Sequence, residues 1–388
     1  MRMADPLLFW AGDICAAAAA IGCLYMAFAS VLVLRFGKGR RESVAEELSP
    51  APATLLVPLC GADPGLAERL ERLCRQDYPA PVQVLCGLQD PADPAIAAVR
   101  SVQVDRPDVT LDLHVEEAVR GSNLKISNLI NMMKDARHDI LVLVDSDMEV
   151  GPGYLGRVVA ALQRPRVGAV TCLYRGIAPE GLWARFSAMA IDVNFLPNVV
   201  LALAFDLARP CFGATIAIQR HTLQRIGGFR AFAEQLWDDF AIGESVRDLG
   251  YEVAVPPFAL GHVCTERSWS ETIANQLRYS RTIRGIDPVG YAGGVITYPF
   301  PLALIAIVLG GGEDALLVAF AALFLRLVLT ACVQHRFGYR ALWMYALLPF
   351  RDLLSFGVYV VSFFGATVVW HGHRYRVAPD GTMMPTAK

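Results

Sequence analysis

Two carboxylates one residue apart give the first sign of chemistry in this sequence. Asp145 and Asp147 directly follow a short apolar run at 140–144. Carboxylates at this spacing can together bind a hard cation that also coordinates a diphosphate. The structural alternative is a turn in which the aspartate side chains cap backbone amides. The spacing alone therefore leaves both a metal site and a turn open.

Further aspartates stand where a strand should end or a helix should begin. Asp90 follows an apolar run, and the nearby Asp93 is suited to a plain turn. Asp238 and Asp239 precede a helix expected over 240–249. As an N-cap, Asp239 would stabilise that helix by about 1 kcal/mol. As a general base it would accept a proton from a reacting hydroxyl, and Asp238 could exchange roles with it.

Basic side chains that could meet a phosphate occur in two places. Lys125 and Asn128 are three residues apart, so they share a helix face ahead of Asp145. The Lys125 amine could neutralise a phosphate or be an ordinary solvated lysine. Arg278 and Arg281 are also three residues apart. Their guanidinium groups suit a diphosphate, and they equally suit a basic helix that meets lipid headgroups.

These side chains need a scaffold, and the sequence around them predicts alternating strands and helices. Short apolar runs bounded by proline, glycine or aspartate predict strands, and apolar residues at helical spacing predict helices. The alternation favours an α/β fold with a parallel sheet covered on both faces. Ligands bind beyond the carboxyl ends of such strands, which places Asp90, Asp145 and Asp147 at one rim. The expected strands are 53–60, 82–88, 109–115 and 140–144, and the expected helices include 66–74 and 123–137.

The composition excludes several classes of protein. Of 388 residues, 54% are hydrophobic and 19% charged, and the mean hydropathy is +0.40. This excludes a disordered chain and an ordinary soluble enzyme without membrane contact. The net charge of −2 excludes a nucleic-acid binder that relies on bulk charge. The 9 cysteines contain no CxxC pair, so we expect reduced thiols rather than a disulfide framework or a zinc site.

Long apolar segments near both ends predict membrane helices. Residues 7–34 exceed the roughly 20 residues that span a bilayer. The basic flank that follows is typical of the cytoplasmic side and contains Arg35, Lys38, Arg40 and Arg41. Further apolar stretches at 295–311, 315–334 and 341–370 precede a basic tail at 371–376.

The chain is therefore expected to have an N-terminal membrane anchor over 1–41 and a cytosolic domain over 42–290. A C-terminal multi-span membrane region with a basic tail follows over 291–388. Charges inside lipid are costly, so Arg326, Arg351 and Asp352 should face protein, water or headgroups. They could pair at a helix end or line a polar site for a lipid. The apolar residues 189–205 could be domain core or part of an acceptor channel near the membrane.

In this order, the residues resemble the ceramide glucosyltransferase family, whose members are membrane glycosyltransferases with a GT-A domain. Bacterial relatives of that family include the hopanoid-biosynthesis-associated glycosyltransferases. The resemblance covers nearly the whole chain, and its specificity lies in the order and spacing of the landmarks together. These landmarks are 58–64, 76–79, 89–95, 123–129, 145–146, 227–229, 238–239 and 370–376.

The resemblance implies a GT-A nucleotide-diphospho-sugar transferase fold and a role for each aspartate of the family's pattern. Asp90 would contact the nucleotide. Asp145 and Asp147 would hold Mg²⁺ or Mn²⁺, with Asp145 also on the donor side. Asp239 would be the catalytic base, and Asp238 would contact the acceptor.

The family's (Q/R)xxRW motif matches only in part. Arg278 would be its arginine and would stabilise the leaving diphosphate. Tyr279 replaces the tryptophan and keeps an aromatic platform for the acceptor, while Asn275 replaces the leading residue. Arg281 would join the donor site, together with the amides and the amine of the landmark that contains Asn123, Lys125 and Asn128.

The implied reaction is an inverting transfer of a sugar from UDP-glucose or UDP-N-acetylglucosamine to a membrane lipid hydroxyl. The look of residues 278–284 favours a hopanoid polyol as the acceptor, and ceramide is the other candidate. The implied location is the bacterial inner membrane, multi-pass, with the catalytic domain facing the cytoplasm. One alternative is a processive polysaccharide synthase, which would need more membrane helices. The other is a non-catalytic membrane scaffold, which should have lost at least one aspartate.

Overall fold

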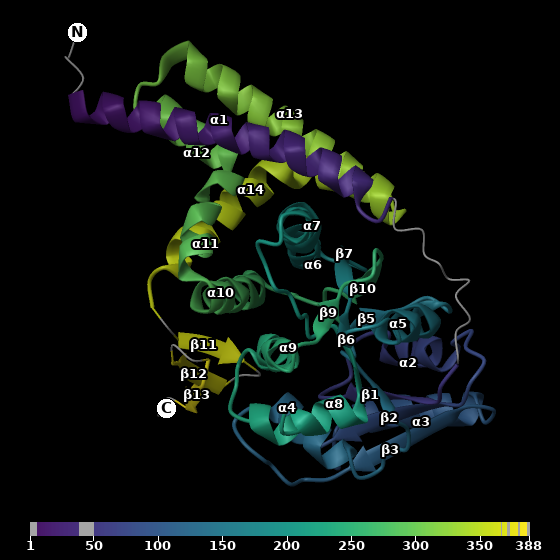
Figure 1. Ribbon diagram of the computed structural model, residues 1–388. Helices are drawn as coiled ribbons and strands as arrows, with labels where there is room; N and C mark the ends of the chain where they lie inside the picture. The colour runs from purple at the N-terminus through teal and green to yellow at the C-terminus, as the bar shows by residue number, and fades with distance from the viewer. Residues whose placement is uncertain (1–5, 39–49, 366, 371–372, 379–380, 386–388) are drawn as a thin grey trace. The chain divides into compact units, whose positions relative to one another are not determined.

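The computed structural model describes residues 6–38, 50–365, 367–370, 373–378 and 381–385 (Figure 1). The chain forms two compact units, each described by itself below. Unit 1 comprises 1–36, 180–207 and 266–374, and unit 2 comprises 37–179, 208–265 and 375–388. The predicted domain 42–290 therefore contributes to both units. Arg40 and Arg41 of the predicted basic flank, and His371 and Gly372 of the last landmark, lie outside the described residues.

Unit 2 is built on a seven-stranded sheet with the order β3-β2-β1-β4-β8-β6-β9. The strands β1 to β4 are parallel, whereas β8 runs antiparallel to both β4 and β6. The α/β class is confirmed, but the expected parallel sheet is in fact mixed. A strand buried on both faces has the same apolar run in either direction, so the sequence of β8 gave no sign of its reversal. The strands of this sheet are β1 (Ala53–Pro58), β2 (Val82–Leu88), β3 (Thr110–Val115), β4 (Ile140–Val144), β6 (Val167–Thr171), β8 (Thr215–Gln219) and β9 (Glu252–Ala254).

A second, three-stranded sheet has the order β5-β10-β7, in which β10 is antiparallel to β5 and parallel to β7. Its strands are β5 (Met148–Glu149), β7 (Leu173–Ile177) and β10 (Ala259–Val263). Near the end of the chain, β12 (His373–Val377) pairs antiparallel with β13 (Met383–Pro385). The short β5 begins three residues after Asp145, so the second sheet fixes the far side of the turn that carries both aspartates.

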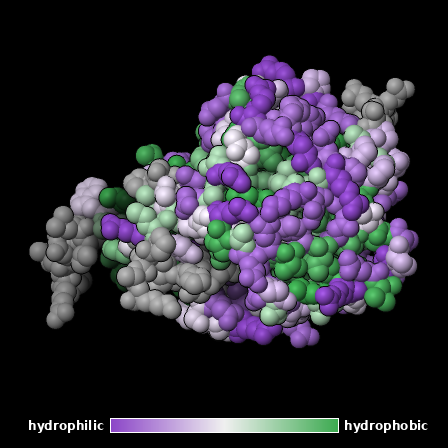
Figure 2. Space-filling model, turned by 90° about the horizontal axis from the view of Figure 1, so that it is seen from below, coloured by the Kyte–Doolittle hydropathy of each residue, from purple (hydrophilic) through white to green (hydrophobic). Residues whose placement is uncertain are grey.

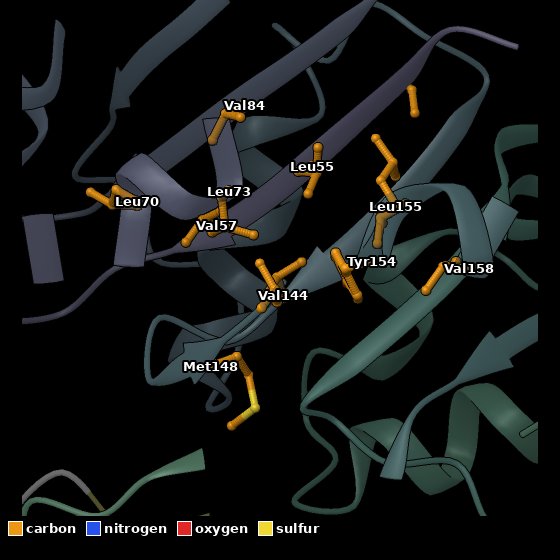
Figure 3. Packing of buried hydrophobic residues seen from close by; sticks show 14 of the residues in the cluster. Leu55, Val57, Leu70, Leu73, Val84, Val144, Met148, Tyr154, Leu155 and Val158 are labelled. Atoms are coloured by element: carbon orange, nitrogen blue, oxygen red, sulfur yellow. The ribbon is translucent and has the colours of Figure 1, made fainter. Parts of the chain in front are cut away.

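Helices cover both faces of the large sheet, because alternate strand residues point to opposite sides. Leu55 and Val57 lie in one apolar cluster, whereas Leu56 lies in the other. Figure 3 shows the first cluster, in which Leu70 and Leu155 from two helices pack onto β1, β2 and β4. The helices are α2 (Leu66–Cys74), α3 (Ala95–Asp105), α4 (Leu124–Met132), α5 (Tyr154–Leu162), α8 (Arg220–Arg225), the 3-10 turn η2 (Phe229–Phe232) and α9 (Asp238–Asp248).

One face of the molecule is mostly polar. Figure 2 shows hydrophilic residues predominating on the face seen from below, with apolar residues gathered in smaller groups between them. The predicted helix 66–74 matches α2. The predicted helix 123–137 corresponds to α4, which ends five residues earlier than predicted. The α9 helix begins at Asp238, so Trp237 rather than Asp239 is its N-cap residue.

Unit 1 consists mainly of long apolar helices. In Figure 1, α1 runs beside α13, and small residues allow close packing: Ala19 is buried against Ala303 and Ala319. A Cβ atom on Gly22 would come within 2.3 Å of the Ile296 carbonyl oxygen, so a larger residue there would force the helices apart. The elements are α1 (Pro6–Arg35), α6 (Leu182–Met189), the π-helix η1 (Ala190–Phe195), α7 (Leu196–Ala204), α10 (Trp269–Ile286), α11 (Pro288–Gly293), the 3-10 turn η3 (Gly294–Thr297), α12 (Pro299–Val308), α13 (Gly312–Phe337), α14 (Trp343–Ser362) and β11 (Thr367–Trp370).

Four helical segments among the described residues are long and apolar enough to cross a bilayer. They are Trp10–Arg35, Leu182–Ala204, Gly312–Phe337 and Trp343–Ser362. A fifth candidate is the pair Pro288–Thr297 and Pro299–Val308, which is bent by 69°. The segment 182–204 belongs to unit 1, so the interpretation of 189–205 as core of the α/β domain is wrong.

Candidate functional site

The carboxyl end of β4 carries the paired aspartates. All five residues of β4 are buried, and the chain turns directly after them, where the Met148 N–H donates to the Asp145 carbonyl at 3.1 Å. The Asp145 carboxylate leaves this turn to meet Lys125, whose Nζ lies 2.5 Å from Oδ1. The sequence thus places a carboxylate and an amine together at the rim of the sheet.

Gly213 joins this ion pair to Asp239. The Gly213 carbonyl accepts from Lys125 Nζ at 3.3 Å, and its N–H donates to Asp239 Oδ2 at 2.9 Å. The other oxygen, Oδ1, accepts from the Phe240 N–H at 2.8 Å. A Cβ atom at position 213 would lie 3.3 Å from Lys125 Nζ and 3.4 Å from Asp239 Oδ2. Glycine therefore keeps Asp145, Lys125 and Asp239 in one compact group.

Asp238 faces a different partner. Its Oδ1 accepts from Asn123 Nδ2 at 3.1 Å, and the same amide donates to the Gln235 carbonyl at 2.8 Å. The Asn123 Oδ1 caps α4 by accepting from the Ile126 N–H at 3.0 Å. Asn123 thus fixes the start of α4, and with it the position of Lys125, against the start of α9.

Burial controls the charges of this group. Burial raises the pKa of Asp238 to about 7, although Lys125 opposes the shift. Burial also raises the pKa of Asp239, against the effect of its two backbone N–H donors. For Lys125, burial alone would lower the pKa, but attraction to Asp145 and Asp238 outweighs it and the pKa is raised. The Lys125 amine is therefore charged, and it stabilises the carboxylates of Asp145, Asp238 and Asp239 electrostatically.

Asp147 is the group that fits a metal ion. Its Oδ1 is buried without a hydrogen-bond partner, and its Oδ2 lies 3.6 Å from His262 Nδ1. Burial raises the pKa of Asp147, and attraction to His262 opposes this rise. A hard cation would satisfy the orphan oxygen, because carboxylates are preferred ligands of Mg²⁺ and Mn²⁺.

The protein supplies only part of a coordination shell. In the ranges that the structure describes, no three His, Cys, Asp or Glu side chains form a metal-binding group. Mg²⁺ is commonly held by one or two carboxylates together with substrate phosphates and water. The residues present therefore fit a cation that arrives with a diphosphate.

Asp90 lies at the same sheet edge, after β2, and is exposed. Its Oδ1 accepts from the Ala92 N–H at 2.8 Å and leaves the second oxygen for a ligand. Asp93 uses both oxygens on backbone N–H groups, those of Gly61 and Ala95, each at 2.8 Å. Asp93 is thus the turn residue, as the sequence indicated.

Asn128 bonds to the sheet rather than to Asp145 or Gly213, the partners of Lys125. It is 3% exposed, and its Nδ2 donates to the Gly87 carbonyl of β2 at 2.8 Å. A Cβ atom on Gly87 would lie 2.6 Å from Asn128 Oδ1. The observed contacts are those of a residue that ties α4 to the sheet, and they lend its predicted donor-binding role no support.

The residues of the partial (Q/R)xxRW motif lie on α10, in unit 1. The Arg278 guanidinium lies over the Tyr279 ring, 4.4 Å from its centroid, and its Nε is buried without a partner. Arg281 instead donates to the carbonyls of Thr367, at 2.5 Å, and Phe364, at 2.9 Å. Carbonyls beyond the end of α14 thus bind the two terminal nitrogens of the guanidinium that the sequence assigned to a diphosphate. The Nε of Arg281, like that of Arg278, is buried without a partner.

Sequence reasoning missed three residues of the group in unit 2. Gly213 gave no signal beyond its place before a strand. Arg69 is 5% exposed, and its Nε donates to the Ser146 carbonyl at 2.8 Å, inside the aspartate turn. His262 is brought to Asp147 by the pairing of β10 with β5. Both contacts join residues far apart in the chain, so local spacing could not reveal them.

Comparison with known proteins identifies the family of this chain. A family model, Glycosyl transferase family 21, matches residues 14–383. Ceramide glucosyltransferase 1 of Caenorhabditis elegans is 20% identical over 347 residues, which cover 84% of this chain and 72% of that protein. Ceramide glucosyltransferase 3 of the same organism is 22% identical over 292 residues, which cover 71% and 62%. A ceramide glucosyltransferase of Gibberella zeae is 33% identical over 131 residues.

The matched lengths differ between these relatives. The chain spans 25% of the Gibberella zeae protein and 62% of ceramide glucosyltransferase 3. Among solved structures, a mannosyltransferase from Pyrobaculum calidifontis in complex with GDP-Man and Mn²⁺ matches with a TM-score of 0.46 and 22% identity. That match covers 89% of this chain and 99% of the other.

Proposed function

Because the chain belongs to glycosyl transferase family 21, we propose that it transfers a sugar from a UDP-sugar to a hydroxyl group of a membrane lipid. The observation that carries the proposal is the group of Asp145, Lys125 and Asp239 around Gly213. It combines a carboxylate for a cation, an amine for a phosphate and a second carboxylate for a proton.

Asp239 is the proposed general base. Its carboxylate accepts the proton of the lipid hydroxyl while the oxygen forms a bond to the anomeric carbon of the sugar. The bond from that carbon to the diphosphate breaks on the opposite face, UDP leaves, and the configuration is inverted. Proton transfer by a positioned group contributes about 10²–10⁴-fold to the rate. The two backbone bonds to Asp239 fix its carboxylate for this task.

The groups around the turn 145–148, which carries Asp145 and Asp147, would stabilise the negative charge of the leaving diphosphate. Asp147 and Asp145 would hold Mg²⁺ or Mn²⁺, which when bound neutralises charge that develops on the diphosphate. Lys125 adds a fixed positive charge beside Asp145. By the resemblance to the family, Arg278 would be a second cation for the leaving diphosphate. Asp90, at the neighbouring rim, would contact the nucleoside.

The donor and the acceptor are narrower proposals. The names of the two Caenorhabditis elegans relatives support ceramide as acceptor and glucose as sugar. The resemblance stated above for residues 278–284 supports a hopanoid polyol and N-acetylglucosamine, and we retain both pairs. The apolar helices of unit 1 suit an acceptor that stays in the bilayer. We place the protein in the bacterial inner membrane with the α/β unit in the cytoplasm, since Arg35 ends α1 and Lys38 follows it.

A mass-spectrometric transfer assay tests the function. The purified chain in detergent with Mg²⁺ is given UDP-glucose or UDP-N-acetylglucosamine, each with ceramide or with a hopanoid polyol. A lipid heavier by one sugar, formed from one donor, supports the proposal and identifies both substrates. Binding of UDP-sugar without any product from the four pairs contradicts the proposed acceptors. Absence of UDP-sugar binding contradicts the function itself.

A further inference from the structure

Among the charged and amide side chains that unit 1 buries between its apolar helices, four form a connected set that we call the polar cluster. They are Gln276 of α10, Arg326 of α13, and Arg351 and Asp352 of α14. Each is at most 8% exposed. Ionisable groups among membrane helices are costly and mark either strong partners or a path for a polar ligand. The bonds within the cluster decide between these two cases, residue by residue.

Arg326 has a complete set of partners. Its Nε donates to Asp352 Oδ2 at 2.9 Å, and its two terminal nitrogens donate to the carbonyls of Val193, at 3.0 Å, and Thr297, at 2.9 Å. These bonds connect α13 to α14, to the π-helix η1 and to the turn η3. The role of Arg326 is therefore to hold unit 1 together, and it leaves no donor nitrogen for a ligand.

Arg351 differs from Arg326 in this respect. One terminal nitrogen donates to Gln276 Oε1 at 2.9 Å, but its Nε and other terminal nitrogen have no partner. Gln276 Nε2 and Asp352 Oδ1 are also buried without a partner. A buried polar group left unpaired is destabilising. Four such atoms on three neighbouring residues indicate a site that a ligand completes.

The chemistry of the four atoms defines the ligand. Three are N–H donors on Arg351 and Gln276, and one is a carboxylate oxygen on Asp352, which only accepts. A hydroxyl group both accepts and donates, so two or more hydroxyls satisfy all of these atoms. A phosphodiester headgroup has no proton to give Asp352 at neutral pH, and the negative charge of any phosphate is repelled by the carboxylate. A hydrocarbon chain satisfies none of them.

The face of α14 that carries Arg351 continues into an aromatic region, which suits the apolar part of a lipid. Arg351, Ser355 and Tyr359 are four residues apart on α14, so they lie on one face. Tyr359 packs against Tyr298 with ring centroids 5.2 Å apart, and Phe356 lies 5.8 Å from Tyr298. The polar cluster thus stands next to an aromatic group, as a site for an amphipathic molecule requires.

We infer that the polar cluster binds the polyhydroxylated headgroup of the lipid acceptor. Arg351 and Gln276 donate to hydroxyl oxygens, and Asp352 Oδ1 accepts from a hydroxyl. The inference rests on the proposed function, because that function defines the acceptor, and it adds the residues that select a lipid with several hydroxyls. Arg326 is a positioning residue that holds Asp352 in place.

A binding experiment without any UDP-sugar tests the inference. The full chain in phosphatidylcholine nanodiscs is incubated with hexadecane-1,2-diol or with its dimethyl ether, and retained probe is measured by native mass spectrometry. The ether keeps both acceptor oxygens but has no proton for Asp352. We expect the diol to bind about tenfold or more tightly, since a bond to a charged group is lost in the ether. Equal binding of diol and ether overturns the inference.

Matched variants then locate the site. Gln276→Met and Arg351→Met should each weaken diol binding about tenfold or more and raise the acceptor KM, with the UDP-sugar KM unchanged. Thr330→Val is the control, because the Thr330 hydroxyl bonds the Arg326 carbonyl within α13. Gln276→Met keeps every buried charge, so it remains informative if Arg351→Met does not fold. Diol binding by folded Gln276→Met equal to that of the wild type overturns the assignment and leaves the cluster a structural, hydrated one.

The same experiment separates this inference from the proposed function. Selective diol binding without sugar transfer to any lipid supports the polar cluster and contradicts the function. Sugar transfer without any preference for the diol supports the function and overturns the polar cluster.

Discussion

Replacement of Asp239 by asparagine is the most informative single change in unit 2. The carboxylate accepts one backbone N–H at each oxygen, from Gly213 at 2.9 Å and from Phe240 at 2.8 Å. An asparagine has one oxygen, so one of these N–H groups would face an NH₂ group. Losing one bond to a charged group costs about 1.5–3 kcal/mol of folding stability at most.

The expected catalytic loss is larger than that and separable from it. Without a base, the rate of transfer should fall about 10²–10⁴-fold, while UDP still binds because the aspartate turn is unchanged. We would measure initial rates of sugar transfer at saturating substrates, the dissociation constant of UDP with Mg²⁺ by calorimetry, and the melting temperature of each variant.

Asp238→Asn is the matched control. The Asn123 amide that donates to Asp238 at 3.1 Å can donate equally to an asparagine oxygen. We therefore expect a transfer rate within about threefold of the wild type, with a raised acceptor KM. An active, folded Asp239→Asn would refute the reasoning, and inactive Asp238→Asn beside it would move the base to the neighbouring carboxylate.

The remaining predictions concern the metal, the amine and pH. Asp147→Ala should weaken Mg²⁺-dependent UDP binding about tenfold or more, measured by calorimetry with and without Mg²⁺; an unchanged Mg²⁺ dependence would contradict the metal assignment. Lys125→Met should lower the free energy of unfolding by about 1–3 kcal/mol, because the partly buried carboxylates around it lose their cation. Denaturation curves check this, and wild-type stability would show that the amine does not hold the carboxylates. Because burial raises the pKa of Asp239, and that of Asp238 to about 7, protonation at falling pH removes the base. Below the apparent pKa, kcat/KM should fall about tenfold per pH unit; a flat profile between pH 5 and 8 would count against a buried aspartate base.

Much of the catalytic unit was predictable because local sequence carries it. The apolar run 140–144 ends in Asp145, and this single fact placed the aspartates at the rim of the sheet. The order of the landmarks identified the family, which the match over 14–383 confirms, and the seven-stranded sheet confirms the α/β class. The turn role of Asp93 was also predictable, since aspartates flanked by proline favour turns.

Features that depend on distant contacts could not be predicted. The segment 182–204 contains Asp192 and Asn198, whose polar groups meet Tyr339 and Tyr25 within unit 1. No local pattern distinguishes such a helix from domain core. Arg281 has the residue type and spacing of a phosphate ligand, yet backbone carbonyls more than 80 residues away bind its two terminal nitrogens. Spacing predicts which residues share a face, but tertiary contacts decide what that face meets.

The central claim is that the group around Gly213 moves a sugar from UDP to a lipid hydroxyl. The most direct measurement is the mass of the lipid product formed by the wild-type chain from UDP-sugar, with Mg²⁺ and then with EDTA. We predict a lipid that carries one added sugar with Mg²⁺, and loss of that product with EDTA. A product that forms equally well with EDTA would contradict the metal site at Asp145 and Asp147. UDP-sugar that binds but is never transferred to any hydroxylated lipid would contradict the claim itself.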